Sequence, residues 1–409
     1  MVNIDNDTKN ALWKLQAIHR DMERRVLGQR NAITVLLAAV VAGEHVCLVG
    51  PPGEAKSLLA SVLASYFEGN FFSWLMTAFT TPNEVLGGPS IKALQEDRQE
   101  RVTTRKLPEA NMALLDEIWK CNSPMLNALL SAMNERVVDG NPIPLRTVVG
   151  LSNEWPAGLY NPLQDNGGDE TSLSALWDRF LWRLEIKAVD DDDALWAIMT
   201  GQVPEAPTAK AVNDHELSLI STLHDKVIQS LAGSDRIRDA ILELNADLKL
   251  QGVSISTRRW RKAMSGLAAH AVLRAAMTKA DEVKVTRKDL TNLNNLLWEL
   301  PQQREAVREA VAGVGASWDV IALETERVVI SLRAKVRRID PRSSEGLSEL
   351  QEIHKALERA EQDVRAAKMD ADDENEDDFE PMRVLSVVDA TMDEVLRAIA
   401  SSMTRRTTT

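Results

Sequence analysis

The sequence has few cysteines, few aromatic residues and no long apolar run, and each shortage excludes a class of protein. Only two cysteines, Cys47 and Cys121, occur in 409 residues. Two thiols make neither a disulfide framework nor a metal-ligand pattern, so we expect buried apolar side chains in a reducing, cytoplasmic compartment. No apolar run reaches about 18 residues, and the start MVNIDNDTKN lacks a cationic leader. Neither a transmembrane segment nor a secretory peptide is therefore predicted.

Positive charge is also in short supply. Lys and Arg number 48 against 61 Asp and Glu, which gives a net charge of −13. Residues 370–380 contribute eight acids and no base, so the rest of the chain carries −5. An acidic chain disfavours a broad nucleic-acid interface. The acidic stretch itself predicts a solvated loop, and a docking site for a basic partner is the alternative.

What the sequence does contain is a phosphate-binding pattern, GPPGEAKS at Gly50–Ser57, directly after the apolar run Val46–Val49. A buried strand, a Gly-Pro turn and a helix start together build a nest of N–H groups around a phosphate. Lys56 would reach the outer phosphates of ATP, and Ser57 would enter the Mg²⁺ shell. Ala55 replaces the usual Gly, which is tolerated provided that this position does not need positive φ. The residues expected to contact the nucleotide are Gly50, Pro51, Pro52, Gly53, Glu54, Ala55, Lys56, Ser57 and Leu58.

A pair of carboxylates, Asp116 and Glu117, ends a second apolar strand that begins at Met112. Beside a phosphate loop such a pair divides the work. Asp116 orients Mg²⁺ and its waters, and Glu117 polarises the attacking water as a general base. The alternative is two solvated acids that cap the next helix, but this does not explain why an apolar strand precedes them.

A third predicted strand, residues 146–151, ends at Asn153. Ligands of an open parallel sheet lie beyond the carboxyl ends of its strands, so Asn153 would bond the γ-phosphate or the lytic water; a simple turn is the alternative. Two later arginines, Arg179 and Arg258, each offer a guanidinium that can meet a phosphate bidentately.

In this order the motifs resemble those of the AAA+ ATPases, specifically the MoxR branch, and within it the RavA-like regulatory ATPases. Family members share the Ala of GPPGxAKS. The matching stretches lie within about residues 20–300 and read VLGQ (26–29), GPPGEAKS (50–57), LMTAFTTPNEVL (75–86), LDEIWK (115–120), LNALLSAMNER (126–136), SNE (152–154), LWDRF (176–180) and STRRWRK (256–262).

The resemblance implies a Mg²⁺-dependent ATPase ring, expected to be a hexamer, that remodels protein complexes together with a partner that carries a von Willebrand factor A domain. It also implies roles for single residues. Gly28 and Gln29 border the adenine, Asn153 is the first sensor, and Arg258 is the second sensor from the lid. Arg179 is the finger that reaches the neighbouring subunit's site, so activity would require the ring.

For Arg179 the alternative is an ion pair with Asp178 or Glu185 on a solvated surface. Trp119 is expected to brace the catalytic strand. Three further arginines are lesser candidates for contacts across the subunit boundary, namely Arg136, Arg183 and Arg259.

The predicted fold class is α/β, with three parts. Residues 1–189 form a parallel-sheet core with helices at 8–26 and 31–42, residues 190–300 a helical lid, and residues 301–409 an all-helical hairpin or three-helix bundle with an acidic loop at 370–380. A flexible link is expected at residues 166–169.

Two hairpins are predicted in the core. The insert at 81–107 is placed in the ring pore by the resemblance, and Asp-Gly at residues 139–140 favours a tight turn for the second hairpin. Pore cations that would grip a substrate are Arg98, Arg101, Arg105 and Lys106, with a solvated loop of mixed charge as the alternative.

Two other functions stay open at this point. The first is a nucleic-acid-stimulated motor, since helicases share the clade, although nucleic acid is not expected as the substrate. The second is an ATP-gated scaffold whose C-terminal helices hold a partner. A chelatase-type motor has no support from any metal-ligand cluster.

Overall fold

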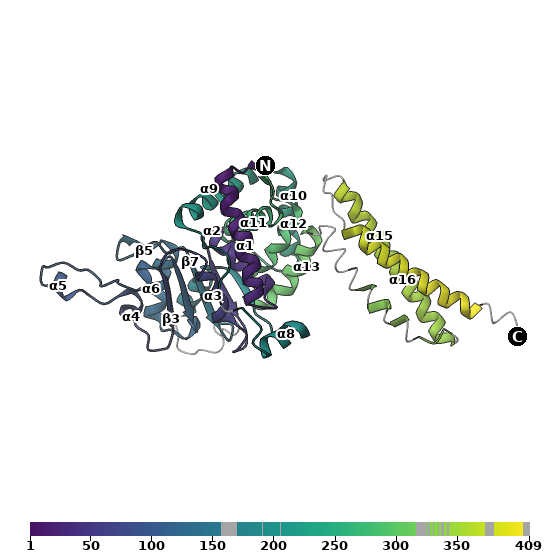
Figure 1. Cartoon of the computed structure of the whole chain (residues 1–409), viewed down its shortest axis with the longest axis horizontal. Coiled ribbons are helices and arrows are strands. Elements are labelled where there is room, and N and C mark those ends of the chain that lie inside the picture. Colours follow the sequence, from purple (N-terminus) through teal and green to yellow (C-terminus); the bar gives the residue numbers. More distant parts are fainter. Residues whose placement is uncertain are drawn as a thin grey trace. The chain divides into compact units, whose positions relative to one another are not determined.

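The computed structural model describes residues 1–156, 170–189, 191–204 and 206–315. Beyond them it describes 325, 328–329, 331–333, 335–336, 339–341, 343–372 and 380–403. The chain divides into two compact units, Met1–Arg308 and Glu309–Thr409 (Figure 1). The link expected at residues 166–169 lies outside the described residues. Among the described helices, none is long and apolar enough to cross a membrane.

The larger unit is built on a five-stranded sheet in the order β3–β4–β7–β2–β8. Every neighbouring pair is parallel, which confirms the predicted α/β class. The strands are β2 (His45–Val49), β3 (Phe71–Leu75), β4 (Met112–Asp116), β7 (Thr147–Ser152) and β8 (Phe180–Glu185). All five residues of β2 are buried, as expected for a strand covered on both faces. The carboxyl ends of β2, β4 and β7 consequently meet at one edge of the sheet.

The helices of the core begin and end at recognisable signals. Asp5 caps the first helix by accepting a hydrogen bond from the Thr8 N–H at 2.9 Å. Gly43 ends the second helix with φ 65°, in the left-handed region that glycine favours. These helices are α1 (Asn6–Arg25), α2 (Arg30–Ala42), α3 (Lys56–Ala64), α6 (Ser123–Asn134) and α7 (Glu170–Trp177).

Both predicted hairpins are present in the core. The insert carries α4 (Pro82–Leu86) and α5 (Ile91–Leu94), and an antiparallel bridge pairs Pro89 with Arg101. Figure 1 shows α5 on an arm that projects from the core. The second hairpin pairs β5 (Val137–Val138) with β6 (Asn141–Pro142), and both of its turn residues have positive φ.

Three of the four expected pore cations already have partners within the chain. Arg98 pairs with two neighbouring glutamates of the arm. Arg101 pairs with Asp139, so it ties the two hairpins together. Lys106 Nζ donates to a backbone carbonyl at 2.7 Å. Contact between these cations and a substrate stays a prediction.

The lid consists of helices that pack on the core. The central helix α11 (Thr257–Thr278) contacts α1, α2 and β8. The lid is not purely helical as expected, because β9 (Glu282–Val283) pairs antiparallel with β1 (Val2–Asn3). The other lid elements are α8 (Asp192–Met199), α9 (Asp214–Leu231), α10 (Asp235–Leu250) and α12 (Arg287–Leu290).

Short 3₁₀ segments occur in the core at Leu107–Glu109 and Ile118–Lys120, and after α12 at Thr291–Asn295 and Pro301–Gln303.

The C-terminal part is helical wherever it has regular structure among the described residues. It contains α13 (Arg304–Gly315), α15 (Ser344–Asp372) and α16 (Glu380–Met403). One buried cluster unites α15, α16 and an earlier helical segment, and it contains Val329, Val336, Leu350, Ile353, Leu357, Val364, Val388 and Val395. The acidic run is not wholly a loop, because its first residues end α15 and its last opens α16.

Candidate active site

The phosphate loop joins β2 to α3, and Lys56 points back into it. Lys56 Nζ donates to Gly50 O at 2.5 Å, Pro51 O at 2.6 Å and Asn153 Oδ1 at 3.0 Å. Burial lowers the pKa of Lys56, and the carboxylates of Asp116 and Glu117 oppose this effect. The ammonium group thus lies inside the loop, where a compact charge reaches phosphate oxygens.

The backbone of the loop corrects one expectation. Ala55 has φ 55° and ψ 15°, in the left-handed region, so the condition under which Ala was expected to replace Gly freely does not hold. Such a conformation costs a residue with a Cβ about 1–2 kcal/mol. Gly50 is needed for another reason, since a Cβ there would lie 2.4 Å from the carbonyl oxygen of Ile186.

The acidic pair occupies the end of β4, next to the phosphate loop. Asp116 accepts from the Glu117 N–H at 2.9 Å, and its Oδ2 lies 3.5 Å from the Ser57 hydroxyl. Glu117 has φ 51° and ψ 42°. Its Oε1 accepts from Asn153 Nδ2 at 2.8 Å and lies 3.2 Å from Lys120 Nζ. Asn153 therefore contacts both Lys56 and Glu117, and the ends of β2, β4 and β7 form one site.

The oxygens of Ser57 and Asp116 fit Mg²⁺, which is usually held by one or two carboxylates together with phosphate oxygens and water. Across the described ranges, no group of three or more His, Cys, Asp or Glu side chains is positioned to hold a metal. A metal held partly by the nucleotide agrees with both observations.

Gly28 and Gln29 lie against the segment that leaves β8. A Cβ at Gly28 would lie 2.9 Å from the Val189 side chain. Gln29 is buried, and its Nε2 donates to Lys187 O at 2.9 Å. The same segment touches the phosphate loop through Ile186 and Gly50. The turn expected to border the adenine is therefore close to the loop.

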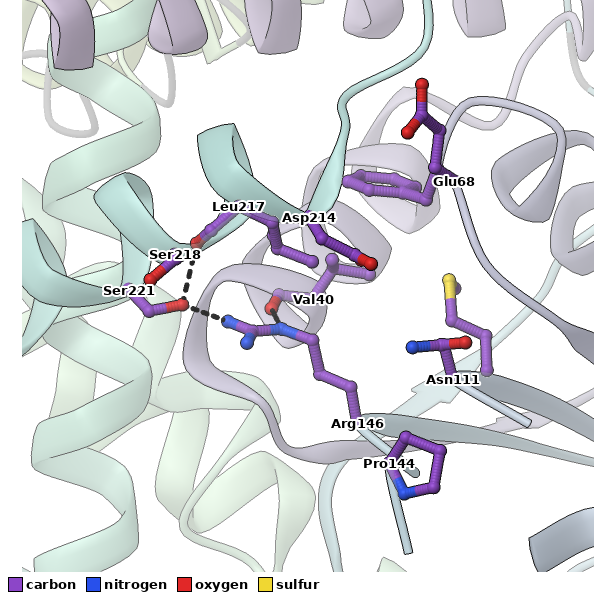
Figure 2. Close-up of a pocket in the computed structure, with 11 residues that line it drawn as sticks. Val40, Glu68, Asn111, Pro144, Arg146, Asp214, Leu217, Ser218 and Ser221 are labelled. Carbon is purple, nitrogen blue, oxygen red and sulfur yellow. Dashed lines mark hydrogen bonds between the residues drawn. The ribbon is translucent and has the colours of Figure 1, made fainter. Parts of the chain in front are cut away.

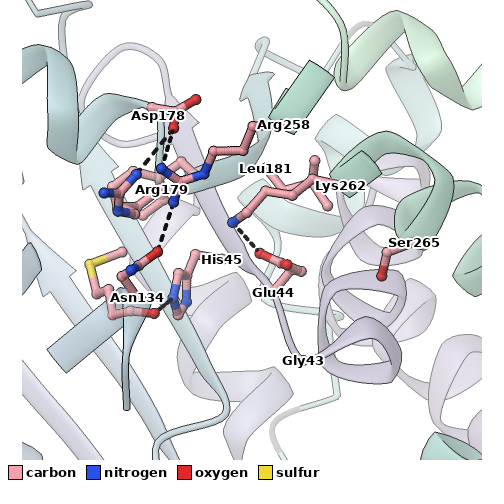
Figure 3. A network of polar contacts seen from close by, with 12 residues as sticks. Gly43, Glu44, His45, Asn134, Asp178, Arg179, Leu181, Arg258, Lys262 and Ser265 are labelled. Carbon is pink, nitrogen blue, oxygen red and sulfur yellow. Dashed lines mark hydrogen bonds and ion pairs between the residues drawn. The ribbon is translucent and has the colours of Figure 1, made fainter. Parts of the chain in front are cut away.

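Arg179 and Arg258 lie at the opposite edge of the sheet. Phe180, the residue after Arg179, pairs with His45 at the amino end of β2, whereas the phosphate loop follows the carboxyl end. Five residues of strand separate the two edges by roughly 16 Å. Both arginines gather around Asp178, and Arg258 Nη2 also donates to Asn134 Oδ1 at 2.7 Å (Figure 3). The two guanidinium groups thus lie together, away from the phosphate loop of their own chain.

The three arginines that are lesser candidates for contacts across the subunit boundary already have partners within their own chain. Arg183 and Arg259 are fully buried and Arg136 is partly buried, and each donates to backbone carbonyls, as a buried guanidinium must. Arg136 bonds Gly43 O and Arg146 O, Arg183 bonds Trp177 O and Trp298 O, and Arg259 bonds Phe180 O, Leu181 O and Leu296 O.

A cavity of about 300 Å³ near the amino ends of β4 and β7 is lined by Arg146 (Figure 2). Its guanidinium donates to Val40 O at 2.6 Å, Val41 O at 2.9 Å and Ser221 Oγ at 2.7 Å. Because these bonds occupy the guanidinium, the cavity is a poor candidate for an anion site.

Sequence reasoning missed two residues that the structure brings to these sites, Lys120 beside Glu117 and Asn134 beside Arg258. The ion pair of Asp178 with Arg179 was the alternative expected for that arginine, but the contact of Asp178 with Arg258 was not foreseen. Lys120 and Asn134 lie in motifs that were recognised, but no pattern in the sequence gives their contacts. Trp119, expected as a brace, packs edge-on against Trp177 and Phe180.

Comparison with known families agrees with this geometry. Residues 13–225 match the MoxR domain of the MoxR-vWA-beta-propeller ternary systems. The chain belongs to the MoxR family of AAA+ ATPases. A second match, to an AAA lid domain, covers residues 236–311. ATP is accordingly the substrate that the family implies.

Relatives of this MoxR ATPase support the same assignment. An uncharacterized protein of Methanocaldococcus jannaschii is 30% identical over 80% of this chain and 82% of its own. The chaperone MoxR1 of Mycobacterium tuberculosis is 28% identical over 41% of this chain and 42% of its own. The crystal structure of a candidate ATPase from Cytophaga hutchinsonii has a TM-score of 0.55 at 19% identity, over 75% of this chain and 95% of its own, and it supports the fold alone.

Proposed function

We propose that this chain hydrolyses ATP with Mg²⁺ in a ring of identical subunits, with six as the expected number, in which a neighbouring subunit completes each site. The observation that carries the proposal is the separation of the two halves of the site. The phosphate loop, Asp116 and Glu117 lie at one edge of the sheet, and Arg179 and Arg258 at the other. We call the edge with the phosphate loop the phosphate edge and the edge with the two arginines the arginine edge. The arginine edge of a second copy can lie against the phosphate edge of the first, and repetition of this contact closes a ring.

Each residue then has one task in the reaction of ATP with water to ADP and phosphate. Lys56 and the loop N–H groups bind the β- and γ-phosphates, and Ser57 and Asp116 hold Mg²⁺, which neutralises phosphate charge. Asn153 orients Glu117 through their 2.8 Å hydrogen bond. Glu117 accepts the proton of the attacking water.

The arginines supply what a single chain lacks. An arginine finger donated across a boundary is worth about 10³–10⁵ in rate where it has been measured. Arg179 takes that part, and Arg258 acts beside it, as a lid residue that serves the neighbouring site. Gly28 and Gln29 border the adenine.

The work done with ATP is remodelling of protein complexes, together with a von Willebrand factor A domain partner. The matched domain belongs to systems that contain such a protein and a β-propeller, and one relative is a chaperone. The two buried free cysteines favour action in the cytoplasm. A special closeness to the RavA-like branch stays a prediction.

The test uses two inactive variants that fail in different halves of the site. Glu117→Gln should bind ATP with a Kd within about twofold of wild type but lose turnover by 100-fold or more, on the order expected for loss of a general base. Arg179→Ala should be equally inactive. Mixed in equal amounts, the two should regain activity, because some boundaries join an intact arginine edge to an intact phosphate edge. Steady-state ATPase rates at several mixing ratios measure this.

Absence of recovery at every ratio, with assembly intact by light scattering, would contradict the shared site. Two further outcomes would favour the other functions. ATPase stimulation by single-stranded DNA that falls steeply with salt indicates a nucleic-acid motor. Partner binding that needs ATP but is indifferent to Glu117→Gln indicates a scaffold.

A further inference from the structure

A single carboxylate, that of Asp178, lies between Arg179 and Arg258, near the amino ends of the sheet strands. Its Oδ2 is 3.1 Å from Arg179 Nη1 and 3.6 Å from Arg258 Nη1 (Figure 3). The side chain of Asp178 is 31% exposed, those of Arg179 and Arg258 15% and 47%. One acid thus joins an arginine from the end of α7 to an arginine from the first turn of α11.

The backbone fixes where this carboxylate stands. The N–H groups of Asp178 and Arg179 donate to Ser174 O and Leu176 O, each at 3.0 Å, so both residues belong to the closing turn of α7. Arg258 is held from its other side by Asn134, the last residue of α6. The second ion pair in Figure 3, between Lys262 and Glu44 at 2.8 Å, satisfies its own charges. Among the described residues, Asp178 is accordingly the one acid that forms an ion pair with these two arginines.

Two guanidinium groups that contact the same carboxylate oxygen carry like charges and repel each other, and the negative charge of Asp178 between them reduces this repulsion. Burial and the charge of Arg258 both lower the pKa of Arg179, and Asp178 opposes them. Arg179 Nε is buried and has no hydrogen-bond partner in the described part of the chain. Without Asp178, little would therefore keep the Arg179 head group in this orientation.

We propose that Asp178 is a positioning residue that holds Arg179 and Arg258 as a preformed pair for the triphosphate bound by the neighbouring subunit. The inference rests on the proposed shared site. Asp178 occupies one side of each guanidinium and leaves other N–H groups of the pair for phosphate oxygens. It fixes the distance between the two cations before ATP arrives. Its contribution is therefore to turnover at the neighbour's site, with no direct contact to substrate.

The test compares Asp178→Ala and Asp178→Asn with wild type in the assembled state. Because misplacement of a catalytic group by about 1 Å can cost 10²-fold, we expect kcat to fall 10- to 100-fold for Asp178→Ala. Asp178→Asn keeps a hydrogen-bond acceptor without the charge, so its kcat should fall less than that of Asp178→Ala. KM for ATP should stay within twofold, because the phosphate loop of each subunit is intact. The matched control is Asp239→Ala, which removes an exposed acid paired with Arg238 at 3.0 Å and should leave both constants unchanged.

Mixed rings separate positioning from a loss of folding. Asp178→Ala subunits keep an intact phosphate edge, and Glu117→Gln subunits keep intact arginines. Random mixing in equal amounts puts about one boundary in four in the productive order, so up to about a quarter of wild-type activity should return. A misfolded Asp178→Ala subunit would not be rescued in this way.

Four results would decide against the inference. Wild-type kcat in Asp178→Ala removes any positioning role, and a raised KM with unchanged kcat makes Asp178 a ground-state binding residue. Absence of rescue by Glu117→Gln, while Arg179→Ala is rescued and Asp178→Ala still binds ATP and unfolds at the wild-type temperature, overturns the role of Asp178 and leaves the shared site standing. Absence of rescue for both variants overturns the shared site itself.

Discussion

At the scale of single residues, the candidate site holds its backbone strain at two positions. Ala55 and Glu117 both adopt the left-handed conformation, with φ 55° and φ 51°. Neither is Gly, so each costs free energy that the surrounding fold must offset. The first turns the chain into α3 at Lys56, and the second aims the carboxylate of Glu117 at Asn153. Strain at these positions accordingly orients the two groups that handle the phosphate and the water.

Replacement of Ala55 by Gly tests the first of these strains. Removal of the Cβ relieves about 1–2 kcal/mol of backbone strain in the folded chain. The greater conformational freedom of Gly in the unfolded chain opposes this gain by about 0.4–1 kcal/mol. We therefore expect Ala55→Gly to stabilise the fold by about 1 kcal/mol, measured as the free energy of unfolding in urea. The control, Ala60→Gly in the interior of α3, should destabilise it by about 1 kcal/mol or more. Equal losses in both variants would show that position 55 carries no strain.

The residues of the phosphate loop and the acidic pair could be predicted from sequence because their chemistry is contained in short, contiguous motifs. The conformation at Ala55 could not, since the same letters are compatible with either sign of φ. Asp178 was considered as an ion-pair partner of Arg179, but its contact with Arg258 joins positions 80 residues apart. No local pattern records such a distance.

At the scale of elements, α11 fastens the lid to the sheet. Its buried Arg259 donates to two carbonyls of β8, Phe180 O at 2.9 Å and Leu181 O at 2.7 Å. Further along, the ring of His270 packs edge-on against Trp182 of β8, with 6.0 Å between the ring centroids. One helix therefore carries Arg258 at its start and is anchored to the strand that follows Arg179.

His270 makes this contact dependent on pH. Burial lowers the pKa of His270 to about 4, with Asp289 opposing the effect. In the unfolded chain His270 binds its proton at about pH 6.5, whereas in the folded chain it does not. The contribution of neutral His270 to the free energy of unfolding is therefore fully present above pH 6.5 and is lost as the pH falls toward 4. At pH 4.5 this loss amounts to about 2–3 kcal/mol.

Replacement of His270 by Leu should remove that share of the pH dependence. Urea unfolding at pH 7.5 and 4.5 should show a smaller fall for His270→Leu than for wild type, by about 2–3 kcal/mol. Burial also lowers the pKa values of His45 and His224, so the variant should retain some slope. His215→Leu is the control, since it lies in α9 outside this contact. Identical slopes for wild type and His270→Leu would contradict the assignment.

The elements that sequence could predict were those with a strong period or a flanking motif: α1, α2, β2, β4 and β7. Two sheet strands were missed. In β8 the charged Arg183 interrupts an apolar run, and only the structure shows that it is buried and bonded to Trp298 O at 2.6 Å. For β3 the aromatic pattern was a usable signal. The pairing of β1 with β9 joins two-residue strands at opposite ends of the unit, and short strands carry no periodicity.

At the scale of the whole molecule, the chain consists of two units with separate cores. The apolar stripes of the C-terminal residues predicted helices, and the buried cluster of Val329, Leu357 and Val388 confirms a core there. Periodicity could not show which segments share that core, because each stripe is compatible with several partners. The boundary between units falls within α13, at Arg308.

The position of α13 leads to a prediction about where the chain can be cut. Arg304 in its first turn pairs with Glu185 at the end of β8 at 2.7 Å and lies over the rings of Trp155 and Trp298. Val307, one turn on, is fully buried. A chain that ends at Gly315 keeps these contacts, and a chain that ends at Gln303 loses them. Loss of a buried Val and its neighbours costs roughly 2–3 kcal/mol.

We therefore expect the chain that ends at Gly315 to bind ATP with a Kd within about twofold of the full chain, and the chain that ends at Gln303 to unfold several degrees lower, about 2–4 °C per kcal/mol for a unit of this size. Titration with a fluorescent ATP analogue and thermal unfolding of the two chains measure this. Loss of ATP binding in the longer chain would show that the C-terminal helices belong to the folding unit of the site. Retention of binding would assign them to a task outside it, since a core that binds ATP without them needs them only for assembly or for a partner.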